Sequence, residues 1–139
     1  MPTAHASVEL LAGPEDVWRF LAEPYYLADW WPNLVAVQPD RLGLAAGARW
    51  RISFHQATLF RRADSEDTLL VVTADPGSRL VIEFVRARMR AELTLTQAGH
   101  DRTRAELQVT GPLLFGFSRG LAKDALARLH NLVQTAATV

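Results

Sequence analysis

The sequence predicts an α+β fold in which one antiparallel sheet of six or seven strands precedes a single long helix. Most of the chain consists of short segments that alternate apolar and polar residues, the pattern of half-buried strands, with turn residues between them. The last segment, residues 113–137, instead repeats its apolar residues along one face of a helix. With 139 residues the chain is expected to form one domain, because that length buries about two thirds of the unfolded surface.

The N-terminal segment predicts one strand and then two short helices. Residues 4–11 alternate apolar and polar side chains, which predicts a strand with one core face. Pro14 suits the first turn of a helix, because proline has no N–H group to leave unpaired there. Pro24 is expected to open a second short helix, and Pro32 to end it by holding Trp31 in extended geometry.

Six further strands are expected before the final helix. We expect them at residues 34–38, 48–54, 68–74, 80–86, 89–96 and 103–110.

The last strands can be paired by their apolar faces. A tight turn at residues 87–88 pairs Phe84 with Ala91, and the following turn pairs Leu93 with Leu107. Both pairings gather apolar residues on one face and charged residues on the other. The first turn lacks the glycine or asparagine that two-residue hairpins prefer, so a longer loop with shifted pairing and the same strand order stays open.

The final helix carries an apolar stripe that faces inward. At ~1.5 Å per residue the helix would be about 35 Å long, enough to lie across the concave side of such a sheet. The stripe contains Leu114, Phe117, Leu121, Ala125, Leu129, Leu132 and Ala136. On its flank, Ala122, Leu126 and Val133 suit a dimer interface, so a monomer and a homodimer both stay open.

Composition excludes several classes of function. Fifteen basic residues balance fifteen acidic ones, so no net field attracts nucleic acid. The chain has no cysteine, and its four histidines fall in different elements without a metal-binding or nucleotide-binding motif, so we expect neither metal nor cofactor. No apolar run reaches the ~20 residues of a membrane span, and no signal peptide is apparent, which predicts a cytoplasmic protein that is not integral to a membrane.

Residues 9–37, ELLAGPEDVWRFLAEPYYLADWWPNLVAV, run from a strand through a Gly-Pro helix start to a Trp-Trp-Pro stop and a second strand. This order resembles the opening of the START-like superfamily, also called SRPBCC, which includes polyketide cyclases, lipid-transfer domains and plant pathogenesis-related proteins. The resemblance covers nearly the whole chain in element order and is most specific at GPEDVW and WWP. It implies a helix-grip fold over residues 1–139, in which a curved sheet wraps around the C-terminal helix and encloses an apolar ligand-binding cavity.

The resemblance also implies where a ligand would bind. The expected cavity lining is Trp50, Ile52, Phe54, Ile82, Phe84, Met89, Ala91, Leu93, Leu107, Phe117 and Leu121. Candidates for a polar rim are Tyr25, Tyr26, Trp30 and Arg86. The Arg86 guanidinium suits a carboxylate, phosphate or enolate oxygen, and a solvated strand end is the alternative role for it.

We expect the cavity to bind a small apolar, aromatic or lipid-like molecule, as a carrier or sensor. No acid or base is placed in the middle of the expected lining, and catalytic residues stay unassigned. A polyketide aromatase/cyclase or dehydratase is the alternative, and a scaffold or interaction module with a filled core is a further one. Cavity volume separates them, because a ligand site typically encloses ~300 to 1,000 Å³.

Overall fold

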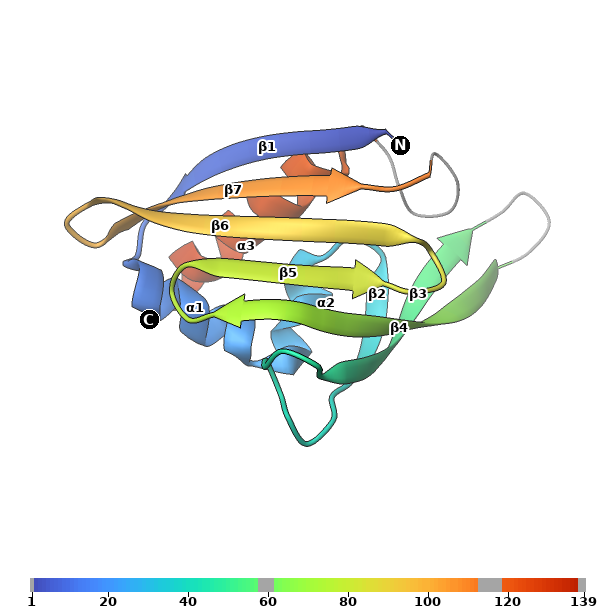
Figure 1. The fold of residues 1–139 in the computed structure, drawn as a ribbon. Helices are drawn as coiled ribbons and strands as arrows, with labels where there is room; N and C mark the ends of the chain where they lie inside the picture. The colour runs from blue at the N-terminus through green and yellow to red at the C-terminus, as the bar shows by residue number, and fades with distance from the viewer. Residues whose placement is uncertain (1, 58–61, 113–118, 138–139) are drawn as a thin grey trace.

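The structure is a computed structural model and describes residues 2–57, 62–112 and 119–137. Within these residues, seven strands form one antiparallel sheet in the order β1-β7-β6-β5-β4-β3-β2 (Figure 1). The strands are β1 (Thr3–Leu10), β2 (Leu34–Gln38), β3 (Arg49–Ala57), β4 (Arg62–Asp75), β5 (Arg79–Phe84), β6 (Met89–Gly99) and β7 (Arg102–Thr110). Strands β2 to β7 form a meander, and β1 joins it by pairing with β7. The predicted antiparallel sheet is confirmed.

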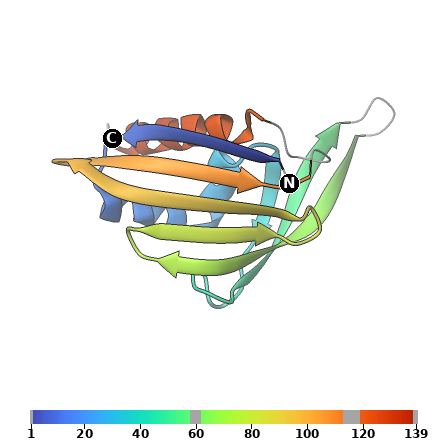
Figure 2. The same ribbon diagram turned by 45° about the horizontal axis from the view of Figure 1, so that its top comes forward.

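The helices all lie on one side of this sheet, which curves around them (Figures 1 and 2). They are α1 (Pro14–Ala22), the 3-10 helix η1 (Pro24–Tyr26), α2 (Leu27–Trp30) and α3 (Leu121–Ala137). Helix α3 packs against β1, β7 and α2. The arrangement is the helix-grip fold that the sequence predicts.

The prolines begin and end the short helices as expected. Pro14 occupies the first turn of α1, and the Val17 N–H donates to the Gly13 carbonyl at 3.0 Å. Trp31 ends α2 in extended geometry, with φ −86° and ψ 125°, as the following Pro32 requires.

The predicted pairing of β5 with β6 is wrong by two residues. Phe84 pairs with Met89 instead of Ala91, and a four-residue turn over 85–88 replaces the two-residue one, which is the longer loop that the sequence left open. A two-residue turn of this kind needs a positive φ angle at both Ala87 and Arg88, which neither residue type readily adopts. Of the two, only Arg88 has a positive φ angle here, at 55°. A shift by two keeps the same residues on the core face. The β6–β7 pairing, with Leu93 opposite Leu107, is confirmed.

Helix α3 begins later than predicted and buries a wider face. Its first residue is Leu121, and the predicted start, with Leu114 and Phe117, lies outside the described residues. The flank assigned to a dimer interface is buried within the chain, with Leu126 and Val133 each 1% exposed. That assignment is wrong because α3 is covered on two sides, by the sheet and by α2.

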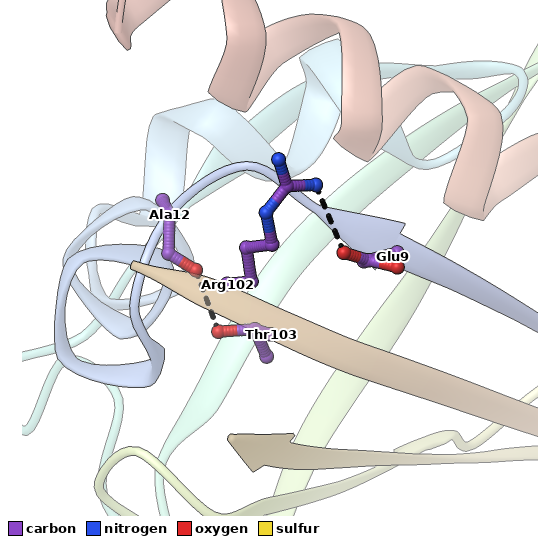
Figure 3. A network of polar contacts seen from close by, with 4 residues as sticks. All are labelled: Glu9, Ala12, Arg102 and Thr103. Carbon is purple, nitrogen blue, oxygen red and sulfur yellow. Dashed lines mark hydrogen bonds and ion pairs between the residues drawn. The ribbon is translucent and has the colours of Figure 1, made fainter. Parts of the chain in front are cut away.

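A small polar network fastens β7 to the start of α1 (Figure 3). The Thr103 hydroxyl, which is completely buried, donates to the Ala12 carbonyl at 2.7 Å. Beside it, the Arg102 guanidinium lies 3.0 Å from the Glu9 carboxylate on β1. Ala12 lies between β1 and α1, so this hydrogen bond holds the segment that connects the sheet to the helix.

Candidate functional site

The candidate site is the concave face of the sheet, which the helices cover. Most of the residues predicted to line a cavity there lie in the buried core, Phe54 is partly buried and packs against that core, and Phe117 lies outside the described residues. The buried ones are Trp50, Ile52, Ile82, Phe84, Met89, Ala91, Leu93, Leu107 and Leu121. Their role in binding a ligand stays a prediction.

Four aromatic rings form a continuous cluster on this face, which we call the aromatic cluster: Trp30, Trp31, Phe84 and Phe54. The ring centroids of Trp31 and Phe84 are 4.9 Å apart, and those of Phe54 and Phe84 are 5.6 Å apart. Trp30 meets Trp31 edge-on at 5.7 Å. Trp31 and Phe84 are fully buried, whereas Phe54 keeps some contact with solvent. The cluster therefore has one accessible end, at Phe54.

A carboxylate lies on the same face. Asp67 pairs with Ile52 across β3 and β4, so its side chain shares the concave face, and it is only 6% exposed. Its Oδ1 accepts the N–H groups of Thr68 and Arg86, both at 2.7 Å, and its Oδ2 accepts that of Ala87 at 3.0 Å. The last two donors belong to the β5–β6 turn, so Asp67 holds that turn against β4.

Sequence reasoning missed Asp67 because it started this strand at Thr68, six residues after β4 begins at Arg62. The signal was present: Asp67 stands two and four residues before Leu69 and Val71, and strand residues two apart share a face. The expectation that this face lacks an acid or a base is therefore wrong.

The predicted rim residues separate into two groups. Trp30 is 2% exposed and belongs to the aromatic cluster. Tyr25 and Tyr26 lie at the surface, 64% and 38% exposed, and the Tyr26 ring contacts that of Phe20 at 5.7 Å. Arg86 is also exposed, and its guanidinium donates to the Glu66 carbonyl at 3.1 Å.

The titratable side chains of the described residues do not form a metal-binding site. Within residues 2–57, 62–112 and 119–137, no three histidine, aspartate or glutamate side chains gather closely enough to hold a metal ion. No helix in this part of the chain has the length and apolar character needed to cross a membrane.

Comparison with known proteins identifies the family. The model of the family described as polyketide cyclase / dehydrase and lipid transport matches residues 1–137. The chain belongs to this family. No curated protein matches the chain.

Solved structures share the fold of this polyketide cyclase / dehydrase family member at low sequence identity. DR_A0006 from Deinococcus radiodurans is 12% identical with a TM-score of 0.72, and the match covers 97% of each chain. CV1439 from Chromobacterium violaceum is 20% identical with a TM-score of 0.72, over 96% of this chain and 99% of the other. DynU16, from the dynemicin biosynthetic locus, is 21% identical with a TM-score of 0.64, over 96% of this chain and 48% of the other. These likenesses show the fold, and family membership supports a ligand-binding or cyclase role.

Proposed function

We propose that this family member binds a small apolar, aromatic or lipid-like molecule against the concave face of its sheet, as a carrier or sensor. The observation that carries the proposal is the aromatic cluster, which is buried at Trp31 and Phe84 and accessible at Phe54. A ligand ring placed beside Phe54 would extend the contacts already made between the rings. Such aromatic pairs add ~0.5 to 1.5 kcal/mol beyond the area that they bury.

Two residues of the same face have side chains that would let the face fit a ligand. Met89 has an unbranched, flexible side chain that fits irregular apolar shapes. Ala91 is small and lies between Ile82 and Val109 on the neighbouring strands, where a larger residue would occupy more of the space toward the helices. Both features support binding of an apolar molecule.

The alternative function is that of a polyketide aromatase/cyclase or a dehydratase. Family membership and the Asp67 carboxylate favour it, because general acid–base catalysis needs a titratable group within hydrogen-bond reach of the reacting atom. Against this, both Asp67 oxygens already accept backbone N–H groups, which tie the carboxylate to the β5–β6 turn. Binding is therefore our first choice.

Binding can be tested with an environment-sensitive apolar dye and the variant Phe54→Ala. We expect the dye to bind the native protein and Phe54→Ala to bind it at least about fivefold more weakly, the equivalent of one lost aromatic contact of ~1 kcal/mol. Leu42→Ala is the control, because Leu42 is 58% exposed and lies outside the buried core.

Native mass spectrometry of freshly purified protein complements this test by detecting a small molecule that co-purifies. A native protein that carries no such molecule and excludes the dye and every small apolar compound tried would overturn the binding function. The scaffold with a filled core would then be the better interpretation.

A further inference from the structure

Asp67 places one negative charge on a face that is otherwise apolar. Among the described residues, two polar side chains are classed as buried, those of Asp67 and Thr103, and of these only Asp67 can carry a charge. No cationic side chain of the described residues pairs with Asp67, and the nearby Arg86 guanidinium donates to the Glu66 carbonyl instead. The charge is held by backbone N–H groups alone.

The hydrogen bonds of Asp67 leave room for one more donor. A carboxylate offers about four acceptor positions. Oδ1 uses two of them, for the N–H groups of Thr68 and Arg86, and Oδ2 uses one, for Ala87. The remaining position is on Oδ2.

The register places Asp67 beside the accessible end of the aromatic cluster. On β4, Ser65 pairs with Phe54 of β3, and Leu69 pairs with Phe84 of β5. Asp67 stands midway between Ser65 and Leu69 on the same face. It therefore lies in the row of the sheet between the two rings, whose centroids are 5.6 Å apart.

We infer that Asp67 determines ligand specificity at this site by accepting a hydrogen bond from a hydroxyl group on an aromatic ligand. The inference rests on the proposed function, because it concerns a ligand bound against the aromatic cluster. The ring would pack beside Phe54 while its hydroxyl donates to Oδ2. A hydroxyl that reaches a charged acceptor in an apolar surrounding gains more than one in water, so the site distinguishes a hydroxylated ring from its ether.

The test compares 2-naphthol with 2-methoxynaphthalene, which share a ring system and differ in whether the oxygen can donate. Quenching of the protein's tryptophan fluorescence gives the Kd of each compound. We expect the native protein to bind 2-naphthol about tenfold more tightly, the selectivity expected of one hydrogen bond to a charged group. This comparison needs no variant, so equal affinity for the two compounds would overturn the inference even if substitutions at Asp67 prevent folding.

Asp67→Asn assigns the preference to the carboxylate. The single carbonyl oxygen of asparagine can serve the N–H groups of Thr68 and Arg86, which places its NH₂ group where Oδ2 stood and leaves the Ala87 N–H without its acceptor, so the variant is compared in its folded form. The side-chain atom proposed to accept the ligand hydroxyl is then a donor, so the preference for 2-naphthol should fall to about twofold or less while 2-methoxynaphthalene still binds. Asp40→Asn is the matched control, because the Asp40 carboxylate, like that of Asp67, accepts backbone N–H groups, here two of them, but is exposed. It should leave the preference unchanged.

The outcomes separate the two proposals. Equal affinity of the native protein for both compounds, or a tenfold preference that survives in folded Asp67→Asn, would overturn the role of Asp67 and leave the binding function intact. Failure of both compounds to bind the native protein would overturn the role of Asp67 together with binding of aromatic ligands.

Discussion

Two aspartates of this chain accept backbone N–H groups in the same way and differ in their burial. Asp40 accepts from Leu42 at 3.0 Å and from Arg49 at 2.8 Å, at an exposed position. Asp67 accepts three N–H groups at a position that is 6% exposed. Water can replace the acceptor in the first case, whereas it reaches the part-buried hydrogen bonds of Asp67 less readily. The pair therefore separates the contribution of burial from that of hydrogen bonding.

We expect Asp67→Ala to lower the free energy of unfolding by about 2 kcal/mol, because three part-buried N–H groups lose a charged acceptor and a hydrogen bond to a charged group contributes ~1.5 to 3 kcal/mol. Asp40→Ala should cost less than about 1 kcal/mol, since water reaches its donors. Urea-induced unfolding followed by tryptophan fluorescence measures both. Equal losses in the two variants would contradict the placement of Asp67 in the core.

At the scale of elements, the hydrogen bond from Thr103 to Ala12 joins two parts of the chain that are far apart in sequence (Figure 3). Thr103→Val keeps the shape of the side chain and removes the donor, which leaves the Ala12 carbonyl without this partner. We expect a loss of about 1 to 3 kcal/mol in thermal unfolding experiments. Thr103→Ser, which keeps the hydroxyl, is the control and should recover most of the hydrogen-bond contribution. A valine variant as stable as the serine variant would show that the hydrogen bond contributes nothing.

The wider buried face of α3 gives a second prediction at this scale. Leu126 is 1% exposed, and its neighbour Ala127 is exposed. Leu126→Asp should destabilise the protein by several kcal/mol, because a charge would face an apolar core without a partner. Ala127→Asp should change the melting temperature little. If both variants kept the native melting temperature, the flank of α3 would lie outside the core, as the predicted dimer interface requires.

The sequence predicts elements well and the details between them less well, for physical reasons that differ from case to case. Alternation and the prolines sufficed to place each strand and α1, since each depends on local pattern, but they missed the first six residues of β4. The sequence did not decide between a two-residue β5–β6 turn and a longer one, because the geometry of the turn depends on Asp67, which lies about twenty residues earlier and whose hydrogen bonds favour the longer turn. The burial of Leu126 was missed because it depends on α2 packing across α3, which no local pattern encodes.

The same holds for the candidate site. Register on the concave face identified Ile82, Phe84 and Ala91 as core residues, because residues two apart on a strand share a face. The aromatic cluster, in contrast, joins Trp31 to Phe84 across more than fifty residues of chain, a contact that only the folded structure reveals.

At the scale of the whole molecule, the two faces of the sheet differ in polarity: the convex face carries charged side chains, and the concave face is largely apolar. The convex face carries exposed ion pairs such as Arg79 with Glu92 and Arg90 with Glu83, each at 2.8 Å. Exposed pairs of this kind contribute only ~0 to 1 kcal/mol, so burial of the concave face supplies most of the stability. That face must then both stabilise the fold and receive a ligand, and the two roles compete for the same apolar surface.

Ala91→Trp measures that competition. Ala91 lies on the concave face between Ile82 and Val109, and a tryptophan there would project toward the helices. If a ligand cavity lies above it, the added ring fills that space: we expect a melting temperature close to that of the native protein and loss of dye binding. A filled core would respond in the opposite way, because overpacking costs ~1 to 3 kcal/mol. A destabilised variant, together with a native protein that excludes the dye, would show that the concave face serves the fold alone.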